Sequence, residues 1–464
     1  IDSEVQEQLQ FLLSSHLVRL KSNHATNAAL IALDNTSGEV IAWVGSSNFK
    51  DTENQGQVDG VLALRQPGSA LKPFAFGAAL ARGMKASDLL EDLPVHFPDG
   101  FSPKNYDESY HGLVRLREAL ACSYNVAAAR VAARLGVKVL LATMRIFGFD
   151  SLVEAPGYYG LGLVLGNGEV TLLELANAYA ALARGGVWMP VRTVKQPDPV
   201  TLKSAAATML GQVAEAPRRV LDRESAYIIT HILSDNAARA GAFGLNSPFH
   251  MPFQFAAKTG TTKDYRDNWA VGYTPDWTVG VWVGNFDGTP MRRVSGISGA
   301  APLLHDAALV MSARYGSRDF AVPISIRGVG ICPVSGDLPA PGCPSVIYEL
   351  FSAKNLPRNT CRIHPDAGDS GESGVYAALA VENPESGDIF KIDPAAPRAS
   401  QAILLRSSLP EGAEGIWEVD GAVLSEHGNQ AWWRLTPGRH QVKVSVVKDG
   451  VTTNTRPTSF LVVP

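Results

Sequence analysis

The sequence predicts an α+β domain over residues 26–325, followed by a small all-β sandwich domain over residues 373–464. Three observations support this fold class. Short apolar runs typical of strands occur at both ends of the first segment, and the stretch between them is rich in Ala and Leu at helical spacing. The tail instead alternates β-rich runs with Gly, Pro and Asn turns. Because early and late strands flank the helices, we expect one sheet that combines both sets.

The chain begins with a predicted linker helix and a strand pair. In residues 1–25 the apolar side chains recur at helical spacing behind candidate N-caps at Asp2 and Ser3. Two short apolar runs follow, Ala28–Leu33 and Val40–Val44, and the Asn, Thr, Ser and Gly residues between them are typical of a hairpin connection. The pattern predicts two antiparallel strands.

The middle of the first domain is predicted to be helical and its end to be a meander. Residues 73–186 are rich in helix formers, interrupted by a polar Gly/Pro stretch at 94–112. Farther along, the alternation predicts three antiparallel strands at 253–255, 268–273 and 277–283.

A Cys-containing connector is predicted over residues 326–372, where Pro, Gly, Cys and Ser are frequent. Beyond it, β-rich runs such as 402–405, 431–435 and 441–447 predict the strands of the sandwich.

Composition excludes several classes of protein. Hydrophobic residues make up 45% and charged residues 19% of the 464 residues, which is ordinary for a folded protein. The net charge of -4 provides no basic field for nucleic acid, so we expect no nucleic-acid partner. No run reaches the roughly 18 apolar residues that a membrane-spanning helix needs, and the N-terminus lacks the layout of a secretion signal.

Three short motifs carry residue types suited to acyl transfer. They are Ser69-Ala70-Leu71-Lys72, Ser123-Tyr124-Asn125 and Lys258-Thr259-Gly260-Thr261.

The first motif combines a nucleophile with a base. If a helix begins at Ser69, the Ser69 hydroxyl and the Lys72 amine share one face, and Pro73 fits the first turn. The free N–H groups of that turn favour a developing oxyanion. Serine needs a base to remove its proton, and a buried lysine serves when desolvation or a second cation such as Lys258 disfavours its charged form. We therefore expect Lys72 to be neutral.

The other two motifs supply groups for proton relay and peptide binding. Ser-x-Asn offers a hydroxyl and an amide, and Lys-Thr-Gly on a strand offers a cation, hydroxyls and a glycine that lets a peptide approach the backbone. The three motifs in this order resemble the active-serine penicillin-recognising enzymes, namely penicillin-binding proteins and serine β-lactamases.

The resemblance covers nearly the whole chain. Residues 28–45, 66–74, 166–186 and 258–288 are similar to the transpeptidase domain of class A penicillin-binding proteins, and the β-rich tail resembles the C-terminal domain of their 1C subfamily. It implies a penicillin-recognising transpeptidase fold, with an antiparallel sheet plus a helical subdomain, and a peptidoglycan DD-transpeptidase that acts through an acyl-serine.

The resemblance also implies the catalytic roles. Ser69 is the nucleophile, which the penultimate D-Ala of a stem peptide acylates. Lys72 takes the proton of the Ser69 hydroxyl. Ser123, with Lys258 nearby, passes that proton to the leaving D-Ala. The amine of a second stem peptide then displaces the acyl-enzyme.

Substrate binding is implied for four further residues. Asn125 holds the donor peptide, Gly260 lies on the binding strand, and Thr259 and Thr261 bind the terminal carboxylate. The backbone N–H groups of Ser69 and Thr261 form the oxyanion hole.

The family implies a setting and partners as well. Stem peptides and β-lactam antibiotics are the expected ligands, and no cofactor is expected. The expected location is the periplasm, with an inner-membrane anchor on an N-terminal segment absent from this sequence. Another envelope protein, either alpha-2-macroglobulin-like or a cell-wall synthesis protein, is a candidate partner of the C-terminal domain. Nothing in the sequence resembles the glycosyltransferase domain of class A synthases.

Two alternatives use the same motifs. In a β-lactamase, Glu174-Leu175-Ala176-Asn177 would supply the Glu-x-x-Asn element that delivers water, although Glu174 lies in a strongly helical segment. A non-catalytic penicillin sensor or peptidoglycan-binding module would keep the pocket without turnover.

The cysteines leave three possibilities open. Cys122 adjoins Ser123 and is expected to be a small buried apolar residue. Cys332, Cys343, Cys361 and His364 have the residue types of a Cys₃His zinc site, but their spacing is loose. One disulfide with a leftover thiol, a zinc site, or neither are all compatible with the sequence.

Three tryptophans in the tail, Trp417, Trp432 and Trp433, are candidates for a binding surface or for the sandwich core. Because Trp432 and Trp433 are adjacent, they point to opposite faces of a strand, and at most one is free for a partner.

Overall fold

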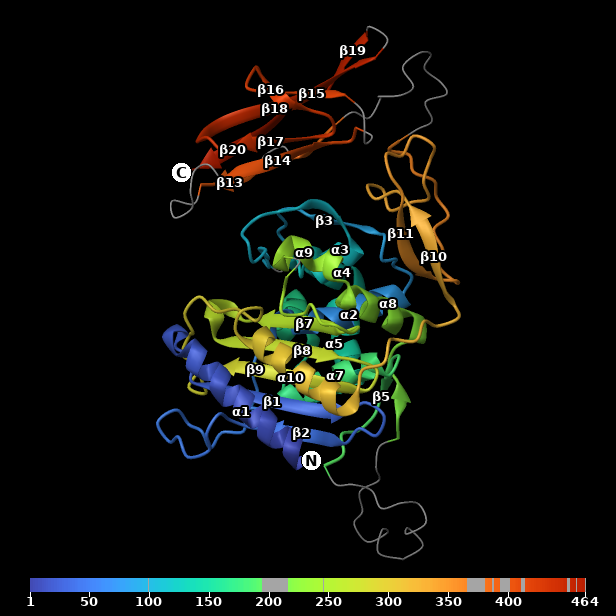
Figure 1. Ribbon diagram of the computed structural model, residues 1–464. Helices are drawn as coiled ribbons and strands as arrows, with labels where there is room; N and C mark the ends of the chain where they lie inside the picture. The colour runs from blue at the N-terminus through green and yellow to red at the C-terminus, as the bar shows by residue number, and fades with distance from the viewer. Residues whose placement is uncertain are drawn as a thin grey trace, which may run out of the picture. The chain divides into compact units, whose positions relative to one another are not determined.

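The computed structural model forms two compact units (Figure 1). It describes residues 1–98, 100–193, 216–244, 246–364, 380–385, 388–392, 401–409, 414–448, 451–455 and 457–463. The first unit comprises Ile1–Ile331, Ser335–Asp337 and Ile347–Asn359, and the second comprises Cys332–Val334, Leu338–Val346 and Thr360–Pro464. Among the described residues, no helix is both long and apolar enough to cross a membrane.

A five-stranded antiparallel sheet organises the first unit. Its order is β2-β1-β9-β8-β7, so the early strands pair directly with the late ones, as predicted. The strands are nearly all buried, and their apolar side chains fill the cores on both faces. The bounds are β1 Asn27–Asp34, β2 Val40–Val44, β7 Ala256–Thr261, β8 Asp267–Tyr273 and β9 Trp277–Gly284.

The first strand of the late meander was predicted at the wrong place. Residues 253–255 precede β7, and Phe253 and Phe255 pack with Trp277 in an aromatic cluster. Their alternation suggested a strand, but the hydrogen-bonded ladder to β8 begins only at Ala256. The Lys-Thr-Gly motif therefore occupies the edge strand itself.

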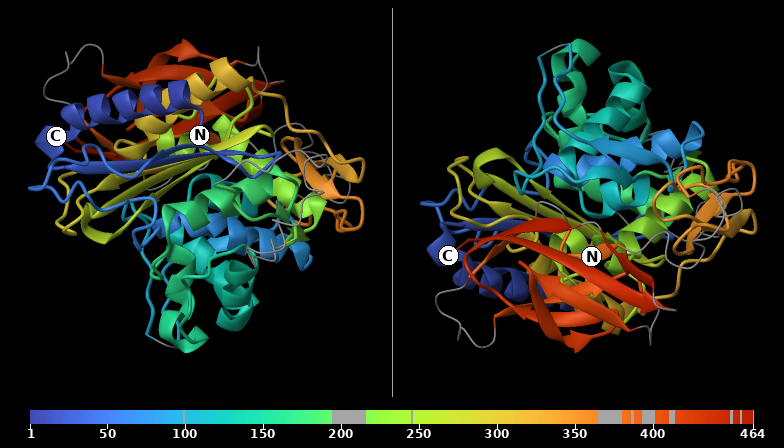
Figure 2. Two further views of the ribbon diagram at one scale, coloured as in Figure 1. Left: turned by 90° about the horizontal axis from the view of Figure 1, so that it is seen from below. Right: turned by 90° about the horizontal axis from the view of Figure 1, so that it is seen from above.

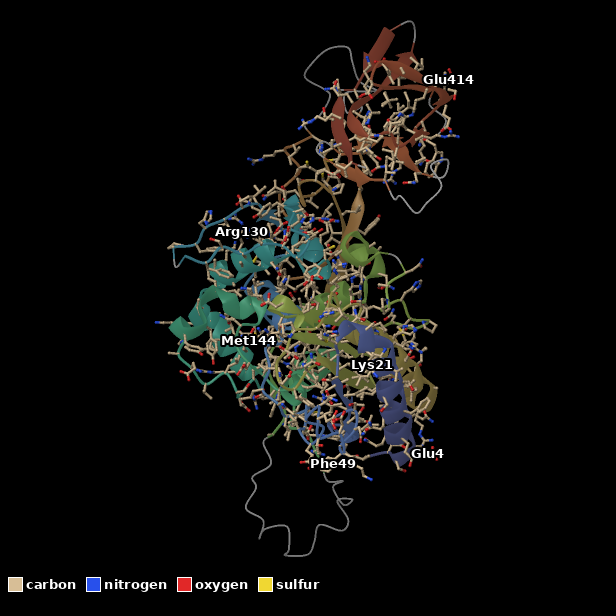
Figure 3. All side chains as sticks on the ribbon, turned by 90° about the vertical axis from the view of Figure 1, so that its left-hand side faces the viewer. Glu4, Lys21, Phe49, Arg130, Met144 and Glu414 are labelled. Atoms are coloured by element: carbon tan, nitrogen blue, oxygen red, sulfur yellow. The ribbon has the colours of Figure 1, made fainter. Side chains whose placement is uncertain are left out.

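Helices cover both faces of this sheet (Figure 2). One face packs against α1 (Ser3–Leu20) and α10 (Ala300–Tyr315), and the other packs against α7 (Leu172–Ala183) and the helical subdomain. Helix α1 is confirmed with its predicted N-cap, because the Asp2 carboxylate accepts hydrogen bonds from the first turn. Glu4 and Lys21 mark its two ends in Figure 3.

The helical subdomain predicted over residues 73–186 is confirmed. Two small hairpins in and after this range, and the helices Arg223–Ser234 and Asn236–Phe243 beyond it, were not predicted. The pairs β3/β4 and β5/β6 are only two to four residues long, too short for a period-two pattern to show. The helices are α2 Lys72–Ala81, α3 Leu116–Ala121, α4 Asn125–Leu135, α5 Val137–Ile146, α6 Pro156–Tyr159, α8 Arg223–Ser234 and α9 Asn236–Phe243. The 3-10 turns are η1 Lys21–Asn23, η2 Gly68–Leu71, η3 Gly160–Leu165 and η4 Lys263–Tyr265, and the hairpin strands are β3 Leu89–Asp92, β4 Gly112–Arg115, β5 Val187–Trp188 and β6 Arg218–Arg219.

A third hairpin lies where the sequence predicted only a connector. Strands β10 (Ile326–Ile331) and β11 (Ile347–Ser352) pair antiparallel, and β11 packs against α8 in the first unit. Buried Glu349 on β11 forms a bidentate ion pair with buried Arg117 on α3. Cys332, Cys343 and several of the Pro and Gly residues that suggested a connector lie between the two strands, whereas Cys361 follows β11. Residues 365–372 of the predicted connector lie outside the described residues.

The second unit is all-β, as predicted. A three-stranded sheet, β12-β14-β17, and a larger sheet, β13-β20-β18-β15-β16 with β19 beside β18, enclose one core around Trp417. Trp433 packs against this core whereas Trp432 is 58% exposed, which confirms that the two adjacent rings face opposite ways. The strands are β12 Val381–Asn383, β13 Ile389–Lys391, β14 Ala402–Ser407, β15 Gly415–Val419, β16 Ala422–His427, β17 Gln430–Arg434, β18 Gly438–Lys448, β19 Val451–Asn454 and β20 Thr458–Val463.

Candidate active site

Ser69 lines a cleft of about 1140 Å³ in the first unit. The predicted residues Ser123, Asn125, Thr259 and Thr261 line the same cleft. The structure thus brings together three stretches that are far apart in the sequence. The two lysine side chains are buried, with Lys72 0% and Lys258 2% exposed.

The turn that carries Ser69 is held from both sides. The indole N–H of Trp269 donates to the Gln66 carbonyl at 2.8 Å, and the Tyr179 hydroxyl donates to the Ala70 carbonyl at 2.8 Å. Gly68 has a φ of +57°, and a Cβ there would lie 2.6 Å from the Thr261 carbonyl oxygen. Only glycine fits this turn, and it sets Ser69 beside the edge strand β7.

The predicted helix start differs from the observed one by a turn. Ser69 lies in the 3-10 turn η2, and the α-helix α2 begins at Lys72 with Pro73 in its first turn. Such tight turns are frequent at helix N-termini, and they leave the first N–H groups free in the same way. The prediction for Pro73 is confirmed.

Lys72 directs its amine toward the second motif. Its Nζ donates to the Asn125 Oδ1 at 2.7 Å, to the Ser123 carbonyl, and at 3.3 Å to the Ser123 Oγ. Burial, and then the charge of Lys258, lower the pKa of Lys72 well below its usual value, against the opposing charge of Asp92. Among the described residues the Ser69 hydroxyl makes no hydrogen bond. The geometry thus holds the Lys72 amine beside Ser123.

Lys258 approaches Ser123 from the strand side. Its Nζ donates to the Ser123 Oγ at 2.8 Å and to the Thr259 carbonyl at 3.0 Å. Burial and the nearby charge of Arg239 lower the pKa of Lys258 to about 7. Arg239 is 3% exposed on α9, and burial lowers its own pKa to about 10. The Ser123 hydroxyl therefore lies between two amines that both release protons readily.

Ser123 occupies a strained backbone position between α3 and α4. Its φ is +63°, a region that costs a residue with a side chain on the order of 1–3 kcal/mol. The conformation aims both the carbonyl and the hydroxyl of Ser123 at Lys72.

A polar network that the sequence did not reveal fixes Asn125. The Asn105 Oδ1 accepts from the Asn125 N–H at 2.7 Å, and the Asn105 amide donates to the buried Asp92 at 2.7 Å. His111 also contacts Asp92 at 2.7 Å and stacks on Tyr124 with ring centroids 3.9 Å apart. Asp92 lies at the end of β3, and Asn105 and His111 lie in the polar stretch at 94–112. The only sequence signal was the stretch's richness in polar residues.

Gly260, the glycine of the third motif, is required for packing within the protein. A Cβ at Gly260 would lie 2.1 Å from the Pro67 carbonyl oxygen, so its absence lets the nucleophile turn pack directly on β7. The sequence suggested that this glycine admits a peptide, but the close approach comes from the chain's own backbone. On the same strand, the Thr261 Oγ1 accepts from the Gly296 N–H at 2.9 Å, which leaves the Thr261 hydroxyl hydrogen free to donate.

Glu174 has a structural position. Its carboxylate caps α7 by accepting from the Thr171 N–H at 2.9 Å and also accepts from the Ser151 N–H at 2.8 Å and the Ser151 hydroxyl at 2.7 Å. Both carboxylate oxygens are used, and Glu174 does not line the cleft. This arrangement disfavours the β-lactamase interpretation.

The cysteines divide between the two units. Cys122 is buried beside Ser123 and its thiol donates to the Ala238 carbonyl, as expected of a small buried residue. Cys332, Cys343 and Cys361 converge with His364 in the second unit, and no disulfide joins any of the four cysteines, all of which lie in the described part of the chain. The disulfide alternative is therefore not adopted.

Comparison with protein families gives three matches along the chain. Residues 28–308 match the penicillin binding protein transpeptidase domain, residues 322–366 match the C-terminal domain of penicillin-binding protein 1A, and residues 372–454 match a penicillin-binding protein C-terminus family. None of the three describes a glycosyltransferase domain.

Curated relatives agree with these matches. The chain is 33% identical to penicillin-binding protein 1C of Escherichia coli (strain K12), over 96% of this chain and 62% of the relative. It is 36% identical to penicillin-binding protein 1A of Neisseria meningitidis, over 57% of this chain and 33% of the relative. The chain thus spans about three fifths of the first relative and a third of the second.

Solved structures share the fold. Penicillin-binding protein 1A from Haemophilus influenzae superimposes with a TM-score of 0.60 and 24% identity, covering 72% of this chain and 54% of that one. The PonA1 protein from Mycobacterium tuberculosis in complex with penicillin V superimposes with a TM-score of 0.55 and 23% identity, covering 70% of this chain and 86% of that one.

Proposed function

Because the chain belongs to the penicillin-binding protein transpeptidase family, we propose that it is a serine-type DD-transpeptidase that cross-links peptidoglycan stem peptides. One observation carries the proposal: the Ser123 hydroxyl lies within hydrogen-bond distance of the Lys72 and Lys258 amines in the cleft that Ser69 lines.

In the acylation step the Ser69 Oγ attacks the carbonyl carbon of the penultimate D-Ala. The Lys72 amine takes the Ser69 proton, a role that burial favours because it lowers the pKa of Lys72 and so disfavours the charged form. The N–H groups of Ser69 and Thr261 stabilise the oxyanion. The peptide bond to the terminal D-Ala then breaks.

The leaving D-Ala amine needs a proton when that bond breaks. Ser123 supplies it from its hydroxyl and is reprotonated by the cationic amine of Lys72 or Lys258. The amine of a second stem peptide next attacks the acyl-enzyme, loses its proton along the same route in reverse, and frees Ser69. The product is a cross-link.

Substrate binding uses the cleft walls. Asn125 is positioned by Asn105 and holds the donor peptide, and the hydroxyls of Thr259 and Thr261, which line the cleft, bind the terminal carboxylate. β-Lactams acylate Ser69 in place of the peptide. The complex of the PonA1 protein with penicillin V supports this ligand class.

The periplasm is the proposed location, and an anchor on the inner membrane remains a prediction. The partner of the C-terminal domain and the three predicted domain boundaries also remain predictions.

Mass spectrometry of the chain after exposure to penicillin tests the proposal. We expect one penicilloyl adduct that maps to Ser69 and is lost in Ser69→Ala but kept in Ser14→Ala, a serine on α1 outside the cleft. Release of D-Ala from a pentapeptide mimic, with transfer to an added acceptor amine, separates a transpeptidase from a penicillin sensor. An adduct on another residue would overturn the assignment of the nucleophile.

A further inference from the structure

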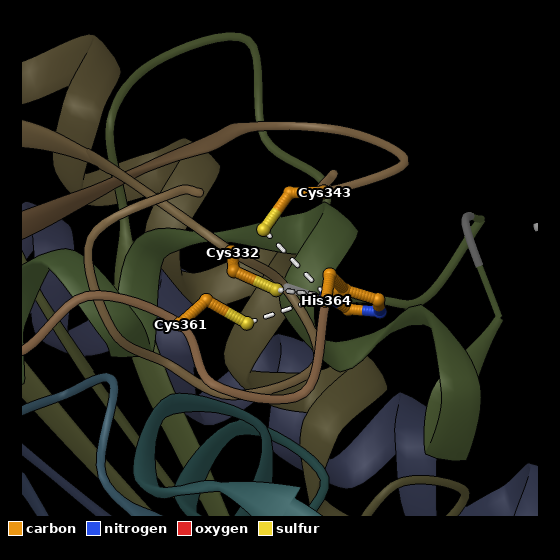
Figure 4. A group of neighbouring side chains, drawn as sticks. All are labelled: Cys332, Cys343, Cys361 and His364. Atoms are coloured by element: carbon orange, nitrogen blue, oxygen red, sulfur yellow. Dashed lines mark hydrogen bonds between the residues drawn. The ribbon is translucent and has the colours of Figure 1, made fainter. Parts of the chain in front are cut away.

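We propose that Cys332, Cys343, Cys361 and His364 bind one structural Zn²⁺ ion through their three sulfurs and the imidazole Nδ1. All four residues lie in the second unit, and Figure 4 shows their side chains pointing toward one another. The inference does not depend on the proposed transpeptidase function.

The four ligand atoms have the spacing of a tetrahedral site. They all lie within 4.8 Å of one another, and the His364 Nδ1 lies 3.4, 3.5 and 3.3 Å from the sulfurs of Cys332, Cys343 and Cys361. A zinc ion with Zn–S near 2.3 Å and Zn–N near 2.0–2.1 Å would set these ligand-to-ligand distances at about 3.6–3.8 Å. Small adjustments suffice to admit the ion.

Hydrogen bonding alone does not account for the cluster. The Nδ1 of a neutral imidazole has one lone pair and can accept from one thiol, yet three sulfurs surround it. A disulfide would join only two of the three sulfurs, and no two of these cysteines form one. A cation at the centre gives every one of the four groups a partner.

The surrounding chain holds the ligands in place. The Ala340 N–H donates to the Cys343 Sγ at 3.3 Å, a contact that favours a thiolate, and the Cys343 N–H donates back to the Ala340 carbonyl at 2.9 Å. The Cys361 N–H donates to the Leu338 carbonyl at 2.8 Å, which joins two of the ligand-bearing segments. Cys332 is 0% and Cys361 4% exposed.

The ligand set indicates a structural ion. Three sulfurs and one nitrogen fill all four positions of a tetrahedron, so no position remains for water or substrate. The ion would cross-link three stretches of a loop-rich region that has little apolar core of its own. It would also protect the thiols from oxidation, because coordinated thiolates are shielded from disulfide exchange.

Elemental analysis of the purified full chain tests the site. We expect about one zinc per chain, and X-ray absorption at the zinc edge should show three sulfur neighbours near 2.3 Å and one nitrogen near 2.0–2.1 Å. Chain free of zinc, a different metal, or a disulfide between any two of Cys332, Cys343 and Cys361 would overturn the proposal.

Variants separate this site from adventitious metal. Cys361→Ser and His364→Ala should lose the zinc, whereas Cys122→Ser, which removes the buried cysteine of the other unit, should keep it. If the site variants fail to fold, release from the unmodified chain decides: an organomercurial reagent should free zinc in step with modification of three thiols. Retention of zinc by both site variants, or release unrelated to thiol modification, contradicts the inference.

Discussion

The buried amine of Lys258 makes the stability of the protein depend on pH. Its pKa is about 7 in the folded chain, whereas an unfolded lysine titrates near 10.4. Between these values the unfolded chain binds a proton that the folded chain does not. The free energy of unfolding therefore rises with pH across this window, and the penalty of burying Lys258 is fully present below about pH 7.

Replacing Lys258 with Met should remove the part of this pH dependence that Lys258 contributes. Relative to Lys258→Met, the unmodified chain should gain up to roughly 5 kcal/mol between pH 7 and pH 10, at 1.36 kcal/mol per pKa unit. Urea unfolding of both proteins at several pH values measures the difference. Lys50→Met, at an exposed lysine, is the control and should follow the unmodified chain. If the free energies of unfolding of Lys258→Met and of the unmodified chain changed with pH in the same way, the lowered pKa of Lys258 would be contradicted.

At the residue scale, motif spacing predicted the residues that carry functional groups but not those that position them. Ser69, Ser123 and Lys258 stand in short motifs, and the structure brings them together. Asn105 and Gly296 act through hydrogen bonds made by irregular segments. Such segments have no periodicity, so nothing in the sequence indicates where they fold back.

The contact between the Ser69 turn and β7 depends on glycine at position 260. In Gly260→Ala the new Cβ would lie 2.1 Å from the Pro67 carbonyl oxygen, which is rigid backbone. We expect a loss of about 1–3 kcal/mol in the free energy of unfolding, as for other overpacked sites, and slower acylation by penicillin. Thermal unfolding and fluorescent-penicillin labelling measure the two effects.

Gly328→Ala is the matched control, because Gly328 also lies on a strand and a Cβ there would meet only Leu350 at 4.0 Å. It should leave both measurements near those of the unmodified chain. If Gly260→Ala and Gly328→Ala had the same unfolding temperature and the same labelling rate, the β7 backbone would be able to move away from Pro67 at little cost.

The hairpin β10/β11 is tied to α3 by the buried pair of Arg117 and Glu349. Arg117 also pairs with the partly exposed Asp235 at 3.2 Å, so Glu349→Gln leaves the buried guanidinium only partly compensated and should cost up to about 3–5 kcal/mol. Glu4→Gln breaks an ion pair with Arg314 in which both side chains are at least half exposed, and it should cost less than about 1 kcal/mol. Denaturant unfolding compares the two variants, and a small effect of Glu349→Gln would mean that Asp235 alone compensates the charge of Arg117.

At the element scale, long periodic segments were predicted well and short ones were missed. The apolar pattern of α1 and the strands β1, β2, β8 and β9 was sufficient to locate them. The hairpin β10/β11 was missed because one buried charge, Glu349, interrupts its apolar pattern, and the Arg117 that compensates this charge is far away in the sequence.

The division of the whole molecule can be tested by truncation. A chain that ends after residue 364 keeps β11 and its contacts with the first unit, whereas one that ends after residue 331 leaves Arg117 buried without Glu349. We expect the longer fragment to bind fluorescent penicillin and to unfold at the higher temperature. Equal unfolding temperatures would favour the predicted boundary at residue 325.

The pairing of β1 with β9 has a consequence for biogenesis. β1 forms its ladder with Trp277–Gly284, so the sheet cannot be completed until nearly the whole first unit has been synthesised. At about 5–20 residues per second, the apolar β1–β2 hairpin waits on the order of 10–50 s for its neighbour. During that interval the unpaired edge of β1 can form hydrogen bonds with other nascent chains. We expect this hairpin to be a main binding site for holdase chaperones.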